Sequence, residues 1–492
     1  AGSKIKVQYQ EALFGEDDKK GNRNEWQGKK MKGYYDVFLS DGNTQQLEPL
    51  WIRVFRYIKI TIDTKEEPLL VKDFYNIFTA YPLREKAYFK SDNENLPGIW
   101  DASWRTARLC ALENYMDCPY YEQLQYIGDT RIQALISMMV AGDDRLARNA
   151  IHQLYNSMQT MGLTKSSHPC NGVQIIPPFS LVYIAMIHDY YMYRGYPELV
   201  QPFLPGIKFI LEWFTSKITD NGMLGPLPYW NHIDGGTDFT DGSPPGISEG
   251  GSAHMTILLA YTLDRAAHLL RDFGDDYHAT QLQKLVDPLK KSTMELCFNR
   301  EKGLIAETPD QKVYSQHTNI FAILTNMFDE KQEKAVMEKV ITDESLIQTT
   351  LYFKFYLFQA MKKAGFGGQI VDQMSAWEKF LDMGLTTFPE HGIESRSDCH
   401  AWSAHPMFDF LNVIAGVSPG SVGFKTIVIE PQLGDLTEVE SGFPHPKGFV
   451  TMNYHKTSNG KLECDIILPE GLTGKLVYKG KEYSLKSGKN EM

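Results

Sequence analysis

The sequence predicts a multidomain protein in which an all-α domain, an (α/α)6 barrel, is flanked by antiparallel β-sandwich domains. Two observations support this fold class. Apolar residues alternate with period two near both ends of the chain, and they recur with a helical period through its middle. With 492 residues, the chain is also long enough for two to four domains. We expect a first sandwich in residues 1–85, the barrel in 86–418 and a second sandwich in 419–492.

The N-terminal region has two clear strand patterns. Residues 4–9 and 54–62 place apolar side chains on alternate positions, as in a half-buried strand. Residues 15–32 between them are rich in Gly, Asn, Lys and Asp, which is typical of a long loop. Because the chain opens directly on a strand, we expect the first sandwich to be incomplete at its N-terminal side.

The middle of the chain shows twelve segments with helical periodicity. Proline and glycine signals mark several of their ends: Pro177 and Pro178 begin the fourth, and Gly195 ends it. Twelve successive helices favour six hairpins in a ring with an inner and an outer layer. A superhelical repeat array is the alternative, but no sequence period of ~30–45 residues recurs. The predicted helices are residues 98–114, 128–141, 144–161, 178–194, 196–217, 251–273, 275–297, 314–325, 329–342, 349–365, 367–383 and 400–417.

Two other regions complete the chain. Residues 218–250 are rich in proline and glycine and include the aromatic pair Tyr229-Trp230. Loops of this length in a compact domain are usually functional or disordered, so we expect this loop over the barrel mouth. After residue 419, strand patterns return and are separated by Gly, Pro and Asn turns. The predicted strands are residues 426–430, 448–454, 462–467 and 475–478.

The composition excludes several classes of function. A net charge of −11 argues against a nucleic-acid partner and disfavours anionic membranes. No apolar run approaches the ~20 residues that a membrane span needs, so we expect no membrane insertion. The six cysteines have no CxxC spacing and the histidines have no paired spacing, so we predict no metal and no cofactor. A homo-oligomer and a periplasmic, secreted or cytoplasmic location are all compatible with the sequence.

The first candidate constellation consists of Asp117, Glu122 and Asp129, between the first two predicted helices. This places three carboxylates in a loop at one end of the barrel. Asp129 also has a structural explanation, because carboxylates are favoured at the start of a helix. Clustered carboxylates repel one another, which raises the pKa of one and makes it a proton donor near neutral pH. The aromatic ring of Tyr126 could contact a sugar face beside them.

The second constellation is centred on Glu390, in the segment that joins the last two predicted helices. In a closed ring of hairpins, this connection and the first one lie side by side at the same end. We therefore expect Glu390 to lie near Glu122. Glycosidic hydrolysis needs two carboxyl groups, one to protonate the departing oxygen and one to activate water or attack carbon. The two loops together predict a glycoside hydrolase acting on a carbohydrate.

The sequence resembles the α-L-rhamnosidases of glycoside hydrolase family 78 over nearly its whole length. The most specific matches are Asp-Cys-Pro at 117–119, followed by Glu122 and Gly128-Asp129, and Ser-Asp-Cys-His-Ala-Trp at 397–402. The resemblance implies an inverting hydrolysis that releases terminal rhamnose, with Glu122 as general acid and Glu390 as general base. It also implies sugar-binding roles for Asp117, Asp129, Tyr126, Trp230, Asp234, His400 and Trp402.

The sequence departs from the family pattern at three places. Tyr120 and Tyr121 stand where the family usually has an arginine before the acid, and Tyr126 stands where it often has tryptophan. Gly235 follows Asp234, where tryptophan is common. These differences bear on the choice of sugar more than on the mechanism.

Three alternatives remain open from the sequence. The first is another glycosidase with the same barrel, and the second is a carbohydrate-binding protein with an inactive barrel. The presence of both Glu122 and Glu390 argues against the second. The third is a polysaccharide lyase, which needs a positive group to neutralise a uronic acid. Arg131 and Arg396 are the only basic residues close to the two loops.

Overall fold

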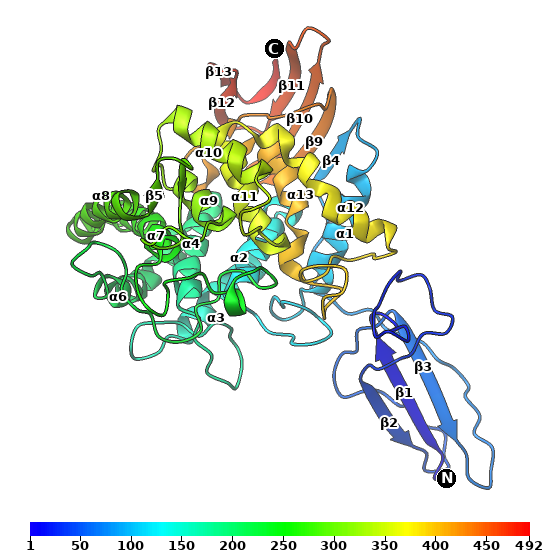
Figure 1. The fold of residues 1–492 in the computed structure, drawn as a ribbon. Helices are drawn as coiled ribbons and strands as arrows, with labels where there is room; N and C mark the ends of the chain where they lie inside the picture. The colour runs from blue at the N-terminus through cyan, green and yellow to red at the C-terminus, as the bar shows by residue number, and fades with distance from the viewer.

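The computed structural model describes residues 1–492, with a helical domain between two β-rich parts (Figure 1). The N-terminal sheet projects to one side of the helices, and the C-terminal strands pack against another side. A single cluster of 122 buried residues runs through the helical domain and the C-terminal sheets. No helix is long and apolar enough to span a bilayer.

The N-terminal region forms one antiparallel sheet of three strands, in the order β2-β1-β3. The strands are β1 (Lys4–Gln10), β2 (Tyr35–Leu39) and β3 (Tyr57–Asp63). The expected sandwich is therefore wrong for residues 1–85, since only one sheet forms there. The predicted strand at 54–62 begins three residues late, because Val54 and Phe55 instead pack on the small core that contains Val7 and Tyr9.

The helical domain alternates fully buried helices with amphipathic ones. The buried helices α2, α4, α7, α9 and α11 contact one another in that order, and the short α13 contacts both α11 and α2. The α-helices are α1 (Leu96–Leu109), α2 (Ile127–Ile136), α3 (Arg145–Asn156), α4 (Pro177–Arg194), α5 (Pro197–Val200), α6 (Leu204–Thr215), α7 (Ala253–Asp272), α8 (Asp276–Cys297), α9 (Gln316–Leu324), α10 (Glu330–Thr342), α11 (Leu351–Ala364), α12 (Ser375–Asp382) and α13 (Pro406–Asp409).

Several predicted helices are confirmed with small shifts, and others are interrupted. α4 begins at Pro177 and ends at Gly195, whose φ of 78° is the left-handed conformation expected after a helix. The predicted helix at 196–217 divides into α5 and α6, with prolines near the start of each part. The predicted helix at 400–417 becomes a 3-10 turn, the short α13 and a π-helical turn over Phe410–Ile414.

The C-terminal region contains two sheets, as predicted. Their strand orders are β14-β11-β10-β9-β4 and β13-β12-β8-β7. β4 (Tyr88–Ser91) precedes the helices in sequence, yet it pairs with β9 at the edge of the first sheet. The other strands are β7 (Val417–Pro419), β8 (Thr426–Ile429), β9 (Glu438–His445), β10 (Gly448–Lys456), β11 (Leu462–Leu468), β12 (Thr473–Tyr478), β13 (Lys481–Leu485) and β14 (Gly488–Glu491); β5 (Phe298–Asn299) and β6 (Leu304–Ile305) form a separate hairpin.

Candidate active site

The two loops predicted to carry the chemistry lie side by side. The N–H of Ala401 donates a hydrogen bond of 2.8 Å to the carbonyl of Asp117. The sulfur atoms of Cys110 and Cys399 lie 3.8 Å apart between the same two segments. The expected meeting of these segments, which lie about 270 residues apart in the chain, is confirmed.

Glu122 faces the second loop and is partly open to solvent. Its carboxylate forms an ion pair with Arg396, and 31% of its side chain is exposed. The guanidinium of Arg396 also lies 5.2 Å from the centre of the Tyr121 ring. Burial, followed by the neighbouring Glu122 carboxylate, raises the pKa of Tyr126, so this phenol stays neutral beside the acid. The residues around Glu122 thus combine aromatic rings with one partly exposed positive charge.

Glu390 is held by its backbone and stabilised as an anion. Its N–H donates to the carbonyl of Ser397 at 3.1 Å, and the indole N–H of Trp402 donates to its carbonyl at 2.7 Å. Burial by itself would raise the pKa of the Glu390 carboxyl, but the hydrogen bond from His391 and nearby positive charges outweigh burial and lower it to about 2. Glu390 is therefore ionised at any ordinary pH, as a general base requires.

Asp117, Asp129 and His400 form a buried polar group beside the two glutamates. His400 Nε2 lies 3.3 Å from Asp129 Oδ1, in the first turn of α2. Burial raises the pKa of Asp117 to about 6, despite the lowering effect of His400. Asp129 Oδ1 and His400 Nδ1 have no hydrogen-bond partner. Buried polar atoms without partners are rare in folded proteins, and sugar hydroxyls would satisfy both atoms here.

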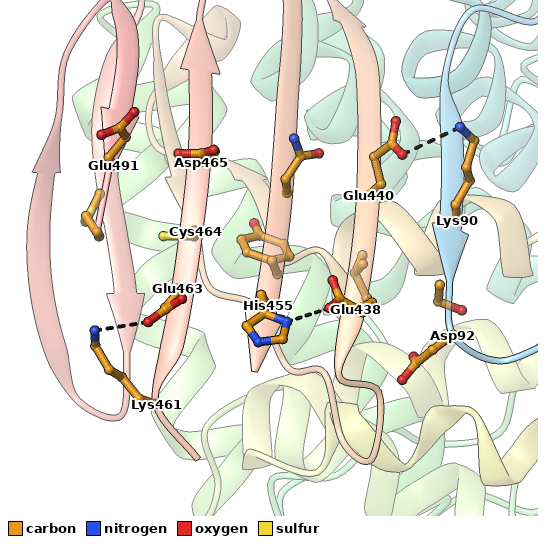
Figure 2. A pocket seen from close by; sticks show the side chains of 15 residues that line it. Lys90, Asp92, Glu438, Glu440, His455, Lys461, Glu463, Cys464, Asp465 and Glu491 are labelled. Carbon is orange, nitrogen blue, oxygen red and sulfur yellow. Dashed lines mark hydrogen bonds and ion pairs between the residues drawn. The ribbon is translucent and has the colours of Figure 1, made fainter. Parts of the chain in front are cut away.

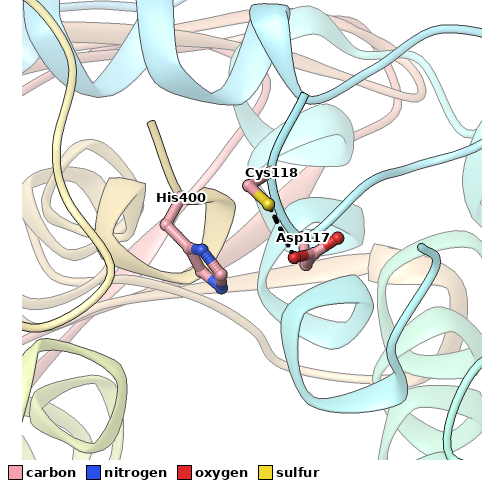
Figure 3. A group of neighbouring side chains, drawn as sticks. All are labelled: Asp117, Cys118 and His400. Atoms are coloured by element: carbon pink, nitrogen blue, oxygen red, sulfur yellow. Dashed lines mark hydrogen bonds between the residues drawn. The ribbon is translucent and has the colours of Figure 1, made fainter. Parts of the chain in front are cut away.

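The same group raises the question of a metal, which the sequence did not predict. Ligand atoms of Asp117, Cys118 and His400 all lie within 4.8 Å of one another (Figure 3). The thiol of Cys118, however, donates a hydrogen bond of 2.9 Å to Asp117 Oδ2. Burial raises the pKa of this thiol to about 11. Since the thiolate is the form that binds metals, these residues fit a hydrogen-bonded cluster better than a metal centre.

Trp402 lies within the same group of side chains. Its ring centre is 4.8 Å from that of Tyr352 and 4.5 Å from that of His400.

Trp230 belongs to the long loop, residues 218–250. Its side chain is 41% exposed, and its indole N–H donates to the carbonyl of Asp241 at 3.0 Å. A Cβ added to Gly236 of this loop would lie 3.0 Å from His391. The long loop therefore packs against the loop of Glu390, as expected for a cover over the site.

Asp234 occupies a different position from the one expected. Its side chain is 0% exposed, and its carboxylate accepts hydrogen bonds from His317 Nε2 at 2.8 Å and from the Thr350 N–H at 2.9 Å. These partners stand at the starts of α9 and α11. The carboxylate is occupied by the protein itself, so Asp234 anchors the long loop rather than binding sugar hydroxyls. The sequence could not reveal this, because the partners lie 83 and 116 residues away.

Replacing Asp234 is expected to loosen this anchor. Asp234→Ala leaves His317 buried without its carboxylate, which should destabilise the fold by about 3–5 kcal/mol. Urea unfolding followed by tryptophan fluorescence would measure the change. Asp238→Ala is the matched control, since Asp238 is an exposed aspartate of the same loop. Equal unfolding midpoints for the two variants would contradict the anchor role.

The sequence reasoning missed a contact between the N-terminal loop and the loop of Glu390. The buried Lys20 ammonium donates 2.7 Å hydrogen bonds to the carbonyls of Ser395 and Arg396 and pairs with Asp398 at 2.9 Å. Arg23 binds the other oxygen of Asp398 at 2.9 Å. We name Lys20, Arg23 and Asp398 the N-terminal clamp. Residues 15–32 read as a polar loop, with no signal for partners some 375 residues away.

The clamp leads to a further expectation. Lys20→Met removes three interactions with the loop of Glu390, so turnover should fall by about tenfold or more as that loop loses its geometry. Limited proteolysis should also cut within residues 390–398 faster than in the unaltered chain. Lys19→Met, at an exposed neighbouring lysine, is the control and should change neither property. Unchanged kinetics and proteolysis in Lys20→Met would refute the clamp.

A separate cavity lies away from these loops. It has a volume of about 1030 Å³ and is lined by charged residues of β4, β9, β10, β11 and β14 (Figure 2). Its charges largely pair with one another: Lys90 with Glu440 at 3.5 Å and His455 with Glu438 at 2.5 Å. This cavity lacks exposed aromatic rings and a pair of free carboxylates. The two loops therefore remain the better candidate for the active site.

Two family models match most of the chain. Residues 84–412 match the family model of the bacterial α-L-rhamnosidase six-hairpin glycosidase domain, and residues 416–492 match that of the bacterial α-L-rhamnosidase C-terminal domain. The comparison with curated protein sequences finds no match.

Solved structures show the same fold. A family 78 rhamnosidase from Bacillus sp. GL1 is 24% identical, with a TM-score of 0.83 over 98% of this chain and 51% of its own. An α-L-rhamnosidase from Dictyoglomus thermophilum is 18% identical, with a TM-score of 0.79 over 99% and 59%. One from Streptomyces avermitilis, complexed with L-rhamnose, is 16% identical, with a TM-score of 0.76 over 99% and 49%. The chain thus spans about half the length of these proteins.

The family models cover well over half of the chain, and they include both loops of the candidate site. The chain therefore belongs to the bacterial α-L-rhamnosidase family, glycoside hydrolase family 78.

Proposed function

We propose that the protein is an inverting α-L-rhamnosidase that releases terminal rhamnose from glycans or glycosides. The observation that carries this proposal is that Glu122 and Glu390, two carboxyl groups from loops distant in sequence, both lie near Arg396. Arg396 is close to both of them, since each glutamate stabilises its positive charge. Family membership points to the same chemistry.

We also propose that the helical domain is an (α/α)6 barrel spanning residues 86–418. The contacts that support this run from α2 through α4, α7, α9 and α11 to α13 and back to α2, which describes an inner ring. The N-terminal ends of α2 and α13 adjoin the two loops of the site. Residues 419–492 then form the C-terminal sandwich, to which β4 contributes one edge strand.

The residues divide into two sets of roles. Glu122 donates a proton to the glycosidic oxygen, while Glu390 takes a proton from the water that attacks the anomeric carbon from the opposite face. Asp117, Asp129 and His400 accept and donate hydrogen bonds to the rhamnose hydroxyls. Ring faces come from three aromatic side chains, Tyr126, Trp230 and Trp402. This reaction uses no cofactor.

A panel of 4-nitrophenyl glycosides tests the proposal. We expect release of nitrophenol from the α-L-rhamnoside, and ¹H NMR should show β-L-rhamnose as the first product, as inversion requires. Hydrolysis of another glycoside but not of the rhamnoside would overturn the choice of sugar. Initial formation of α-L-rhamnose would overturn the inverting mechanism.

A further inference from the structure

Arg396 is a charged group that the proposed reaction leaves without a role. Its guanidinium pairs with the Glu122 carboxylate and lies over the ring of Tyr121. Its side chain is 49% exposed, so it borders solvent. Arg131, in the first turns of α2, is buried and paired with Asp189 at 2.8 Å. Arg396 is therefore the arginine that an incoming ligand can reach from the open side of this site.

The ion pair engages the carboxyl group that the proposed reaction needs. A proton donor must contact the glycosidic oxygen of the substrate, whereas an oxygen of Glu122 is bound to Arg396. The productive complex consequently needs Arg396 to move away from Glu122 or to share its charge with another anion. A substrate that carries its own negative charge near Glu122 would provide that partner.

The geometry indicates where such a charge would be. A proton donor touches the glycosidic oxygen, so the leaving group lies directly beside Glu122. Arg396 and the ring of Tyr121 therefore border the space that the leaving group enters. A carboxylate accepts two parallel hydrogen bonds from a guanidinium, which gives direction as well as charge to the contact.

The backbone of Arg396 is held by the N-terminal clamp, while half of its side chain is exposed to solvent. Its carbonyl accepts a hydrogen bond of 2.7 Å from Lys20 Nζ, and the adjoining Asp398 is bound by both cations of the N-terminal clamp. Lys20 and Arg23 are buried in these contacts, so neither competes for a ligand. Rotation about side-chain bonds alone can carry the guanidinium from Glu122 to a carboxylate.

We propose that Arg396 is a specificity residue that recognises an acidic sugar as the leaving group, so that the preferred substrate is rhamnose linked to a uronic acid. The carboxylate of the uronic acid draws Arg396 from Glu122 and so leaves the Glu122 carboxyl group free to contact the glycosidic oxygen. This inference rests on the proposed rhamnosidase function and specifies its substrate class.

The test compares two substrates that differ in one charge. These are α-L-rhamnosyl-(1→4)-glucuronic acid and its methyl ester, with release of rhamnose as the measurement. We expect kcat/KM to be about fivefold higher for the acid, in line with a partly exposed ion pair. Arg396→Gln should bring the ratio near one, and Arg396→Lys should restore part of it. Arg300→Gln, at an exposed arginine of the β5–β6 turn, should keep the unaltered ratio.

A second measurement keeps the test valid if Arg396→Gln fails to fold. In the unaltered protein, raising NaCl from 0.05 to 0.5 M should reduce the preference for the acid, because salt screens exposed charges. Equal rates for acid and ester, or a preference that persists in folded Arg396→Gln, would overturn the inference. If nitrophenyl rhamnoside is hydrolysed but neither disaccharide is, the inference about Arg396 is wrong and the proposed rhamnosidase function still holds. If no rhamnoside is hydrolysed, the proposed function itself fails.

Discussion

Glu122→Gln is expected to lower kcat on a rhamnoside with a poor leaving group by about 10²–10⁴-fold, the usual contribution of a general acid. The amide keeps the size of the side chain and can still contact Arg396, but it has no proton to give at the acidity required. Turnover of an alkyl α-L-rhamnoside, followed by rhamnose release, measures the effect.

The dependence on leaving group separates this role from a general loss of structure. A 2,4-dinitrophenyl rhamnoside needs little protonation on departure, so Glu122→Gln should retain much more activity on it. Glu113→Gln is the matched control, since Glu113 is an exposed glutamate of the same inter-helix segment. A variant that loses activity equally on both substrates would show that Glu122 is not the proton donor.

Glu390→Ala is expected to abolish turnover while rhamnose binding is retained. Without the base, no group removes the proton from the attacking water, whereas the proposed sugar-binding residues Asp117, Asp129 and His400 are unchanged. Steady-state kinetics would measure the loss, and calorimetric titration with L-rhamnose would measure binding. Added azide needs no deprotonation, so it should restore cleavage and yield β-L-rhamnosyl azide. Normal turnover, or loss of binding together with turnover, would refute the assignment.

The ionisation of Glu390 leads to a prediction about pH. A base works only when deprotonated, and the pKa of Glu390 is lowered to about 2. Loss of activity through protonation of this group should therefore begin only well below pH 4. Since the hydrogen bond from His391 contributes to the lowering, His391→Ala should move this acid limb of kcat/KM to higher pH. An unchanged limb in that variant would contradict the contribution of His391.

Local patterns in the sequence predicted much of this molecule correctly. The strand at residues 4–9 and the helix bounded by Pro177 and Gly195 depend on periodicity and on backbone preferences of neighbouring residues. Predictions failed where a neighbour distant in sequence decided the outcome. The expected N-terminal sandwich is a single sheet, and β4, in the segment expected to open the helical domain, pairs with β9.

The sequence by itself determined the succession of a strand-rich, a helical and a second strand-rich region, because periodicity depends on nearby residues. It also singled out the carboxylates between residues 117 and 129 and Glu390 as candidates, the latter through the expected ring of hairpins. Only the tertiary structure decided which charges meet. Arg396 and Glu122 are 274 residues apart, Lys20 and Asp398 are 378 apart, and Asp234 and His317 are 83 apart. Burial and the histidines that the fold brings close set the ionisation of Glu390 and Asp117, and the contact with His317 occupies the Asp234 carboxylate. Burial and these contacts arise only when the chain has folded.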